Sequence, residues 1–175
     1  MIALQDDTDK NTDKKINKAI KHIEHSLKAK LWDDENTLDV KKGKKVFDEE
    51  AKAVKQLTKI LKKADDSTTT AITAAITTLV NVDRMLAQEV IASVPIDTED
   101  KIVNKELEKA QKALVKAEKQ LEKDKPKPDK AIKQFKKAWE HAQHALNHEK
   151  KDHDHDDKKK HHDHDDKKKH HDHDD

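Results

Sequence analysis

The sequence predicts an all-α protein: an up-and-down bundle of about five amphipathic helices followed by a disordered C-terminal tail. Only one of its 175 residues is glycine and aromatic residues make up 2%, which disfavours a sheet-rich fold with many tight turns. Apolar residues recur at spacings of three and four, as they do along one face of an α-helix. The last 25 residues are only Lys, Asp and His, so no buried apolar surface offsets the entropy of ordering them.

The chain divides into three parts by composition. Residues 1–11 are polar and expected to be flexible, residues 12–150 form the bundle, and residues 151–175 form the tail. The expected helices span residues 12–32, 44–64, 67–94, 98–123 and 128–149. The short connections between them favour antiparallel neighbours.

Capping and breaking residues delimit the first two helices. Thr12 or Asp13 is suited to cap the first helix, and the single glycine, Gly43, precedes the second. The apolar stripe of the first helix is Ile16, Ile20, Ile23, Leu27 and Leu31. That of the second is Phe47, Ala51, Val54, Leu57 and Leu61.

The third helix carries one acidic residue among its apolar positions. Its stripe is Ile72, Ile76, Leu79, Asp83, Leu86 and Val90. We expect Asp83 to form an ion pair with Arg84 or a hydrogen bond between helices, because a buried charge needs a partner. Pro95 ends this helix.

The last two helices are separated by the sequence Lys-Pro-Lys-Pro. Asp97 or Thr98 is expected to cap the fourth helix, and Pro128 suits the first position of the fifth. The stripe of the fourth helix is Val103, Leu107, Ala110, Leu114, Ala117 and Leu121. That of the fifth is Ile132, Phe135, Trp139, Ala142 and Leu146.

Composition and motifs argue against catalysis and several classes of partner. The net charge is +1, and a one-sided basic patch with stacking aromatics is missing, so no nucleic-acid partner is expected. The chain has no cysteine, which excludes thiolate metal sites. No histidine follows a glutamate by three residues, so a di-iron bundle centre is not predicted. We expect no enzyme activity, no obligatory cofactor and no membrane span.

The tail has the composition of a metal-binding segment. It repeats every nine residues and contains three His-x-His pairs, in which an extended chain points both imidazoles the same way. Imidazole suits Zn, Ni and Cu(II), and the intervening aspartates supply oxygen. The candidate ligands in the tail are His153, Asp154, His155, His161, His162, Asp163, His164, His170, His171, Asp172 and His173. Binding is expected to be exchangeable and to fade below about pH 6.5, where free imidazole protonates.

Further histidines lie on the helices. His141, His144 and His148 are spaced to lie on the outer face of the fifth helix, where they would extend the tail's ligands onto a rigid scaffold. The alternative is three solvated histidines. His22 lies level with His141 if the first and fifth helices are neighbours, so the two are expected to share an ion if they meet, and to be ordinary surface histidines otherwise.

Four segments resemble a known family. They are KAIKHIEHSL (18–27), LDVKKGKKVFDEEAKAVKQL (38–57), VDRMLA (82–87) and KPDKAIKQFKKAWEHAQ (127–143). Together they resemble an uncharacterised helical domain near the C-termini of secreted or surface proteins of archaea and some bacteria. The resemblance implies a helical fold and an extracellular setting, but no activity.

Two functions remain open from the sequence. The first is binding and buffering of Zn, Ni or Cu(II) by the tail on its helical scaffold. The alternative is a structural or interaction module of a cell surface or assembly, with the tail as a charged brush or a metal-bridged cross-linker between chains. An extracellular or surface location is expected. A cytoplasmic location is the alternative, because the first residues have no basic segment typical of an export signal.

Overall fold

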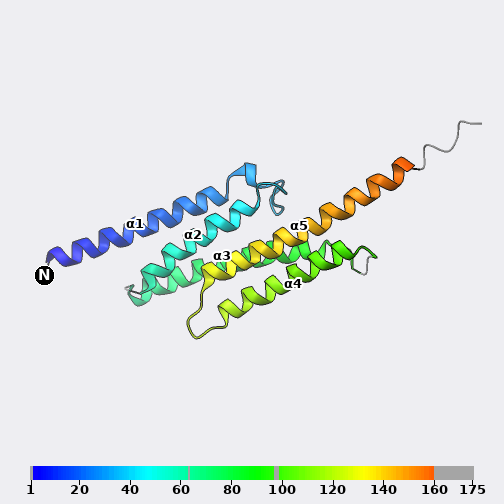
Figure 1. Ribbon diagram of the computed structural model, residues 1–175. Helices are drawn as coiled ribbons and strands as arrows, with labels where there is room; N and C mark the ends of the chain where they lie inside the picture. Colours follow the sequence, from blue (N-terminus) through cyan, green and yellow to red (C-terminus); the bar gives the residue numbers. More distant parts are fainter. Residues whose placement is uncertain (1, 63, 97–98, 160–175) are drawn as a thin grey trace, which may run out of the picture.

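A computed structural model describes residues 2–62, 64–96 and 99–159, with side chains described for residues 10–62, 64–96 and 99–148. Over these residues the chain forms five α-helices, one short 3-10 helix and no β-strand. Successive α-helices reverse direction (Figure 1). The prediction of an all-α, five-helix bundle is therefore confirmed.

Helix α1 spans Ile2–Ser26, so it starts before the predicted Thr12 and ends before the predicted Trp32. The early start follows from a polar segment that contains neither glycine nor proline to stop a helix. At the other end, Lys28 adopts an extended backbone. The Trp32 indole N–H then donates to the Ser26 carbonyl oxygen at 2.8 Å and fastens the chain back onto the helix end.

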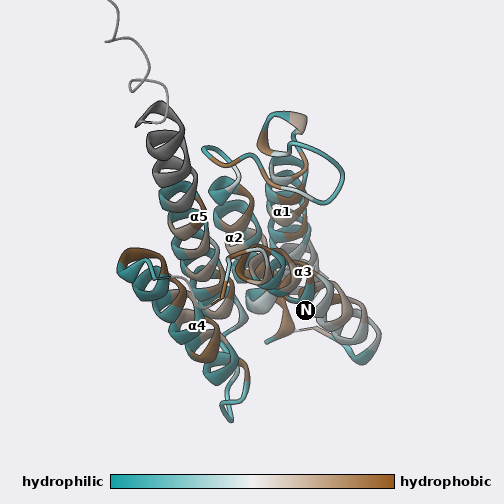
Figure 2. Cartoon of the chain, turned by 90° about the vertical axis from the view of Figure 1, so that its right-hand side faces the viewer, coloured by the Kyte–Doolittle hydropathy of each residue, from teal (hydrophilic) through white to brown (hydrophobic). Residues whose placement is uncertain are grey.

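The predicted apolar stripe of α1 is partly wrong. Ile20 and Leu27 are 46% and 65% exposed, whereas Ala19 is buried. Ile16 and Ile23 pack against the core from positions beside Ala19. Helix α1 lies at the edge of the bundle with α2 as its main neighbour (Figure 2), so only one narrow side of it is covered.

The connection between α1 and α2 requires its glycine. It contains the 3-10 helix η1, Ala29–Leu31, and an isolated bridge between Trp32 and Leu38. A Cβ at Gly43 would lie 2.5 Å from the Leu38 Cβ and 2.7 Å from the Asp39 carbonyl oxygen. The close approach of this turn, rather than an unusual backbone angle, excludes a side chain there.

Helix α2, Lys44–Leu61, is buried on more than its predicted face. Phe47, Ala51, Val54 and Leu57 are buried as expected, but so are Val46, Ala53 and Ile60. The reason is that α2 packs against α1, α3 and α5. A helix with neighbours on several sides buries residues that a single stripe does not include.

Aspartates cap the next two helices. Helix α3 spans Asp66–Ala92, and the Asp65 side chain accepts from the Thr68 N–H at 2.7 Å. Helix α4 spans Lys101–Leu121 and is capped by Asp100, which accepts from the N–H groups of Ile102 and Val103. The predicted caps of α4, Asp97 and Thr98, lie outside the described residues, and its predicted start is three residues early.

Helix α5, Pro128–Lys159, is the central helix and begins at the proline predicted. It packs against α2, α3 and α4. Ile132, Phe135 and Trp139 are buried in the main core, and the Trp139 ring lies 6.0 Å from that of Phe47. Ala142 and Ala145 join a smaller cluster with α4. The apolar stripe predicted for α5 is therefore largely confirmed.

The end of α5 differs from the prediction. The helix continues ten residues past the expected end at Glu149, so residues 151–159 of the tail have helical backbone. No glycine or proline follows Pro128 to stop it. In Figure 1 these last turns extend beyond the end of α4. Within the described part of the chain, no helix is both long and apolar enough to cross a membrane.

Candidate metal centre

The tail residues predicted as ligands fall mostly outside the described part of the chain. His153, Asp154 and His155 lie on helical backbone near the end of α5, rather than in the extended conformation assumed for a His-x-His pair. Outside the described residues lie His161, His162, Asp163, His164, His170, His171, Asp172 and His173. The described candidates are therefore on the helices.

Helices α4 and α5 bring three candidate ligands together. His141 and His144 lie one turn apart on α5, and Glu106 faces them from the neighbouring helix α4. One ligand atom from each of the three lies within 4.8 Å of the other two. The His141 Nδ1 and Glu106 Oε2 are 2.7 Å apart, and the rings of His141 and His144 meet edge to face with centroids 6.5 Å apart. We call this group the α5 site.

The electrostatics of the α5 site keep its carboxylate ionised. Burial alone would raise the pKa of Glu106, but hydrogen bonds and charges from Lys109 and His141 outweigh burial and lower it. The Lys109 Nζ lies 2.6 Å from Glu106 Oε1 and leaves Oε2 to His141. An ionised carboxylate beside two imidazoles is the donor set expected of a zinc or nickel site.

His148 does not join this group. Its Nδ1 lies 2.9 Å from Oδ2 of Asp100, the residue that caps α4. The backbone N–H groups of Ile102 and Val103, together with His148, outweigh the effect of burial and lower the pKa of Asp100. The three α5 histidines predicted as one ligand series thus separate into a pair, His141 and His144, and a cap contact.

The condition under which His22 and His141 would share an ion, that the first and fifth helices are neighbours, is not met. Helix α2 lies between α1 and α5 (Figure 2), and each of the two histidines has its own glutamate. The His22 Nδ1 is 2.6 Å from Glu49 Oε2 on α2, whereas His141 bonds Glu106 on α4. The second helix separates the first from the fifth, because α1 packs against α2 and α5 packs against the other side of the bundle with α2, α3 and α4.

Two acidic side chains, Asp83 of α3 and Glu50 of α2, are buried in the core. Asp83 is fully buried, but Arg84 pairs with Glu118, with Nε to Oε1 at 2.8 Å, instead of with Asp83. The expected ion pair is wrong because adjacent helical residues point in different directions. Asp83 meets Glu50 of α2 instead.

Burial is the main cause that raises the pKa of both carboxyls. Burial raises the pKa of Glu50 to about 7. Burial and the Glu50 charge raise that of Asp83 well above its usual value. Among the described residues neither Asp83 oxygen has a hydrogen-bond donor while both acids are ionised. A shared proton would let one carboxyl donate to the other, which is the hydrogen bond between helices expected for Asp83.

Sequence reasoning missed the carboxylate of the α5 site. Glu106 looks like any other charged residue on the surface of an amphipathic helix. No family model, curated protein or solved structure matches this chain. The geometry of the described side chains therefore has to carry the functional argument.

Proposed function

We propose that the protein binds and buffers divalent transition-metal ions, namely Zn, Ni or Cu(II), at the α5 site and along its His/Asp tail. One observation carries the proposal: Glu106 supplies a third ligand to His141 and His144 on the helix that leads into the tail. The ligands predicted for the tail thus begin on a rigid scaffold. Two histidines and a glutamate form a set that binds zinc in proteins.

The ligands of the α5 site also favour reversible binding of particular metals. Three protein ligands leave a coordination position for water, and an open position of this kind permits exchange of the ion. All donors are imidazole or carboxylate, since the chain has no cysteine, which favours Zn, Ni and Cu(II) over Cu(I). These properties suit reversible binding rather than a permanent structural ion.

Lys109 holds Glu106 in place and reduces metal affinity. Its hydrogen bond to Oε1 orients the carboxylate toward His141, as outer partners of metal ligands do. Its positive charge repels an incoming cation. We expect affinity in the micromolar range in consequence, which is suitable for buffering.

A titration of the wild-type chain and one full-length variant tests the function. In the variant, called the tail-silenced chain, all eight tail histidines are replaced by asparagine. We expect calorimetry with zinc at neutral pH to show fewer bound ions than the wild type, with at least one micromolar site retained. Binding no tighter than millimolar in the wild-type chain would contradict the proposal.

Glu106→Gln in the tail-silenced chain tests the α5 site itself. Losing one of three ligands should weaken zinc binding at this site by about tenfold or more. The matched control is Glu108→Gln, because Glu108 lies on the same helix, is exposed, and pairs with Lys112. Equal weakening by both substitutions would show a general charge effect and overturn the α5 site.

The alternative function, a structural or interaction module, makes a different prediction for the same samples. If the tail cross-links chains, zinc should increase the particle size in light scattering for the wild type but not for the tail-silenced chain. A zinc-loaded monomer supports buffering.

A further inference from the structure

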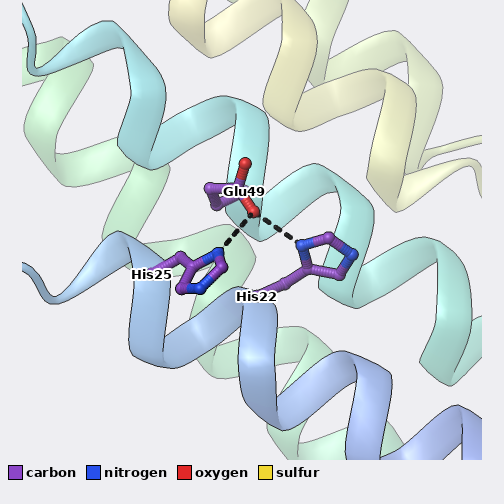
Figure 3. A group of neighbouring side chains, drawn as sticks. All are labelled: His22, His25 and Glu49. Atoms are coloured by element: carbon purple, nitrogen blue, oxygen red, sulfur yellow. Dashed lines mark hydrogen bonds and ion pairs between the residues drawn. The ribbon is translucent and has the colours of Figure 1, made fainter.

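Three residues at the junction of α1 and α2 repeat the chemistry of the α5 site. His22 and His25 lie one turn apart on α1, and both Nδ1 atoms point at the same oxygen of Glu49 on α2 (Figure 3). The distances from Glu49 Oε2 are 2.6 Å to His22 and 3.8 Å to His25. As in the α5 site, one ligand atom from each residue lies within 4.8 Å of the others.

In both groups a lysine also contacts the second oxygen of the glutamate. Lys52 lies three residues after Glu49 and contacts its Oε1 at 2.7 Å. Lys109 holds the same position after Glu106, with a contact of 2.6 Å. Each site is thus a His-x-x-His on one helix facing a Glu-x-x-Lys on its neighbour. The chain builds the same group in two separate hairpins, with the order of the helices reversed.

We infer that His22, His25 and Glu49 form a second divalent-metal site, which joins α1 to α2 and binds independently of the tail. This inference rests on the proposed function for the class of ion, Zn or Ni. We call it the α1 site.

The distances between the donor atoms are close to those around a bound zinc ion, so the side chains would have to move little to bind one. A tetrahedral zinc ion about 2.1 Å from each donor places the donors about 3.4 Å apart, and the distances of 2.6 Å and 3.8 Å from Glu49 bracket that value. The ion takes the place of the proton between His22 and Glu49, because the ligating nitrogen must be deprotonated. Water completes the fourth position.

The state of Glu49 fits this role. Burial would raise its pKa, but hydrogen bonds and charges from Lys52 and His22 outweigh burial and lower it. The carboxylate is 19% exposed and the imidazoles of His22 and His25 are 27% and 52% exposed, so an ion can reach the group from solvent.

Metal at the α1 site would stabilise the packing of α1, a helix with one main neighbour. Helix α1 covers one side of α2 and leaves Ile20 and Leu27 exposed. Its large apolar contacts to the core are Ile16 and Ile23. An ion bound to α1 and α2 at once stabilises the docked helix and not the detached one.

Hydrogen exchange measured by mass spectrometry tests this inference in the full-length tail-silenced chain carrying Glu106→Gln. Zinc at ten times its dissociation constant should slow amide exchange in residues 16–26 by about tenfold. Glu49→Gln, which should weaken binding by about tenfold or more as Glu106→Gln does at the α5 site, should reduce that protection to about twofold or less. Glu24→Gln, at the exposed position between the two histidines, should keep it.

The outcomes separate the two proposals. No zinc protection of residues 16–26, with protection of α4 and α5 in the tail-silenced chain that keeps Glu106, overturns the α1 site alone. No zinc effect in any chain overturns the proposed function as well. Circular dichroism without metal checks that Glu49→Gln folds, and His22→Asn provides a second loss of a ligand if it does not.

Discussion

The environment of each carboxylate in this protein depends on which face of its helix it occupies. Glu49 and Glu50 are adjacent, yet Glu49 faces two histidines near the surface and Glu50 faces Asp83 in the core. The outer carboxylate has a lowered pKa because hydrogen bonds and charges from Lys52 and His22 outweigh its burial. The inner one has a raised pKa because it is buried.

The buried acid pair makes stability depend on pH. Glu50, with its pKa raised to about 7, and Asp83, also raised, keep protons in the folded state that the unfolded state releases. Stability from this pair is therefore fully present below about pH 4 and is lost as pH rises toward about 7.

Asp83→Asn removes the repulsion and supplies an amide donor to Glu50. We expect the metal-free variant to exceed the wild type in unfolding free energy by about 1–3 kcal/mol at pH 8, and by less at pH 5. Urea denaturation at the two pH values measures this. The exposed Asp124→Asn should change both values by similar small amounts. An unchanged pH slope in Asp83→Asn would contradict the account of the pair.

At the scale of elements, periodicity predicts where helices are but not how many sides of each are covered. The predicted ends of α2, α3 and α4 agree with the observed ends to within three residues, since an apolar stripe requires burial. The ends of α1 and α5 do not, because polar segments without glycine or proline continue a helix whether or not they pack. The extra buried face of α2 depends on three neighbours that no single stripe specifies.

The sequence indicates which histidine each of the two glutamates lies level with. In an antiparallel hairpin, residues equally far from the turn lie level. Glu106 and His141 are centred on the turn near Asp124, as are Asp100 and His148, and Glu49 and His22 are centred near Glu35. The position of the turn is predictable, but the rotation of each helix about its axis is not, and that rotation decides whether level residues face one another.

The turn before α2 gives a prediction for the α1–α2 hairpin. Gly43→Ala places a Cβ against Leu38 and the Asp39 carbonyl, so backbone has to move. We expect a loss of about 1–3 kcal/mol in unfolding free energy, as for other overpacked sites. The exposed Lys41→Ala, two residues earlier, should cost much less. Urea unfolding compares the two, and equal stability would show that the turn yields without cost.

At the scale of the molecule, α5 connects the core of the fold to the candidate metal ligands. It contacts three of the other helices, carries two ligands of the α5 site, and continues into the tail. The α1 site lies in the other hairpin, between α1 and α2. In the proposed function, metal would therefore bind at two separate contacts between helices as well as along the tail, and each bound ion would bridge the two helices of one hairpin.

Counting the zinc ions bound by the full-length tail-silenced chain at neutral pH is the most direct test of this account. Calorimetry should find two ions per chain with micromolar affinity. It should find one in Glu49→Gln or in Glu106→Gln, and none in the double variant. A tail-silenced chain that binds no zinc, or a double variant that binds as well as its parent, would contradict the claim that the bundle itself binds metal.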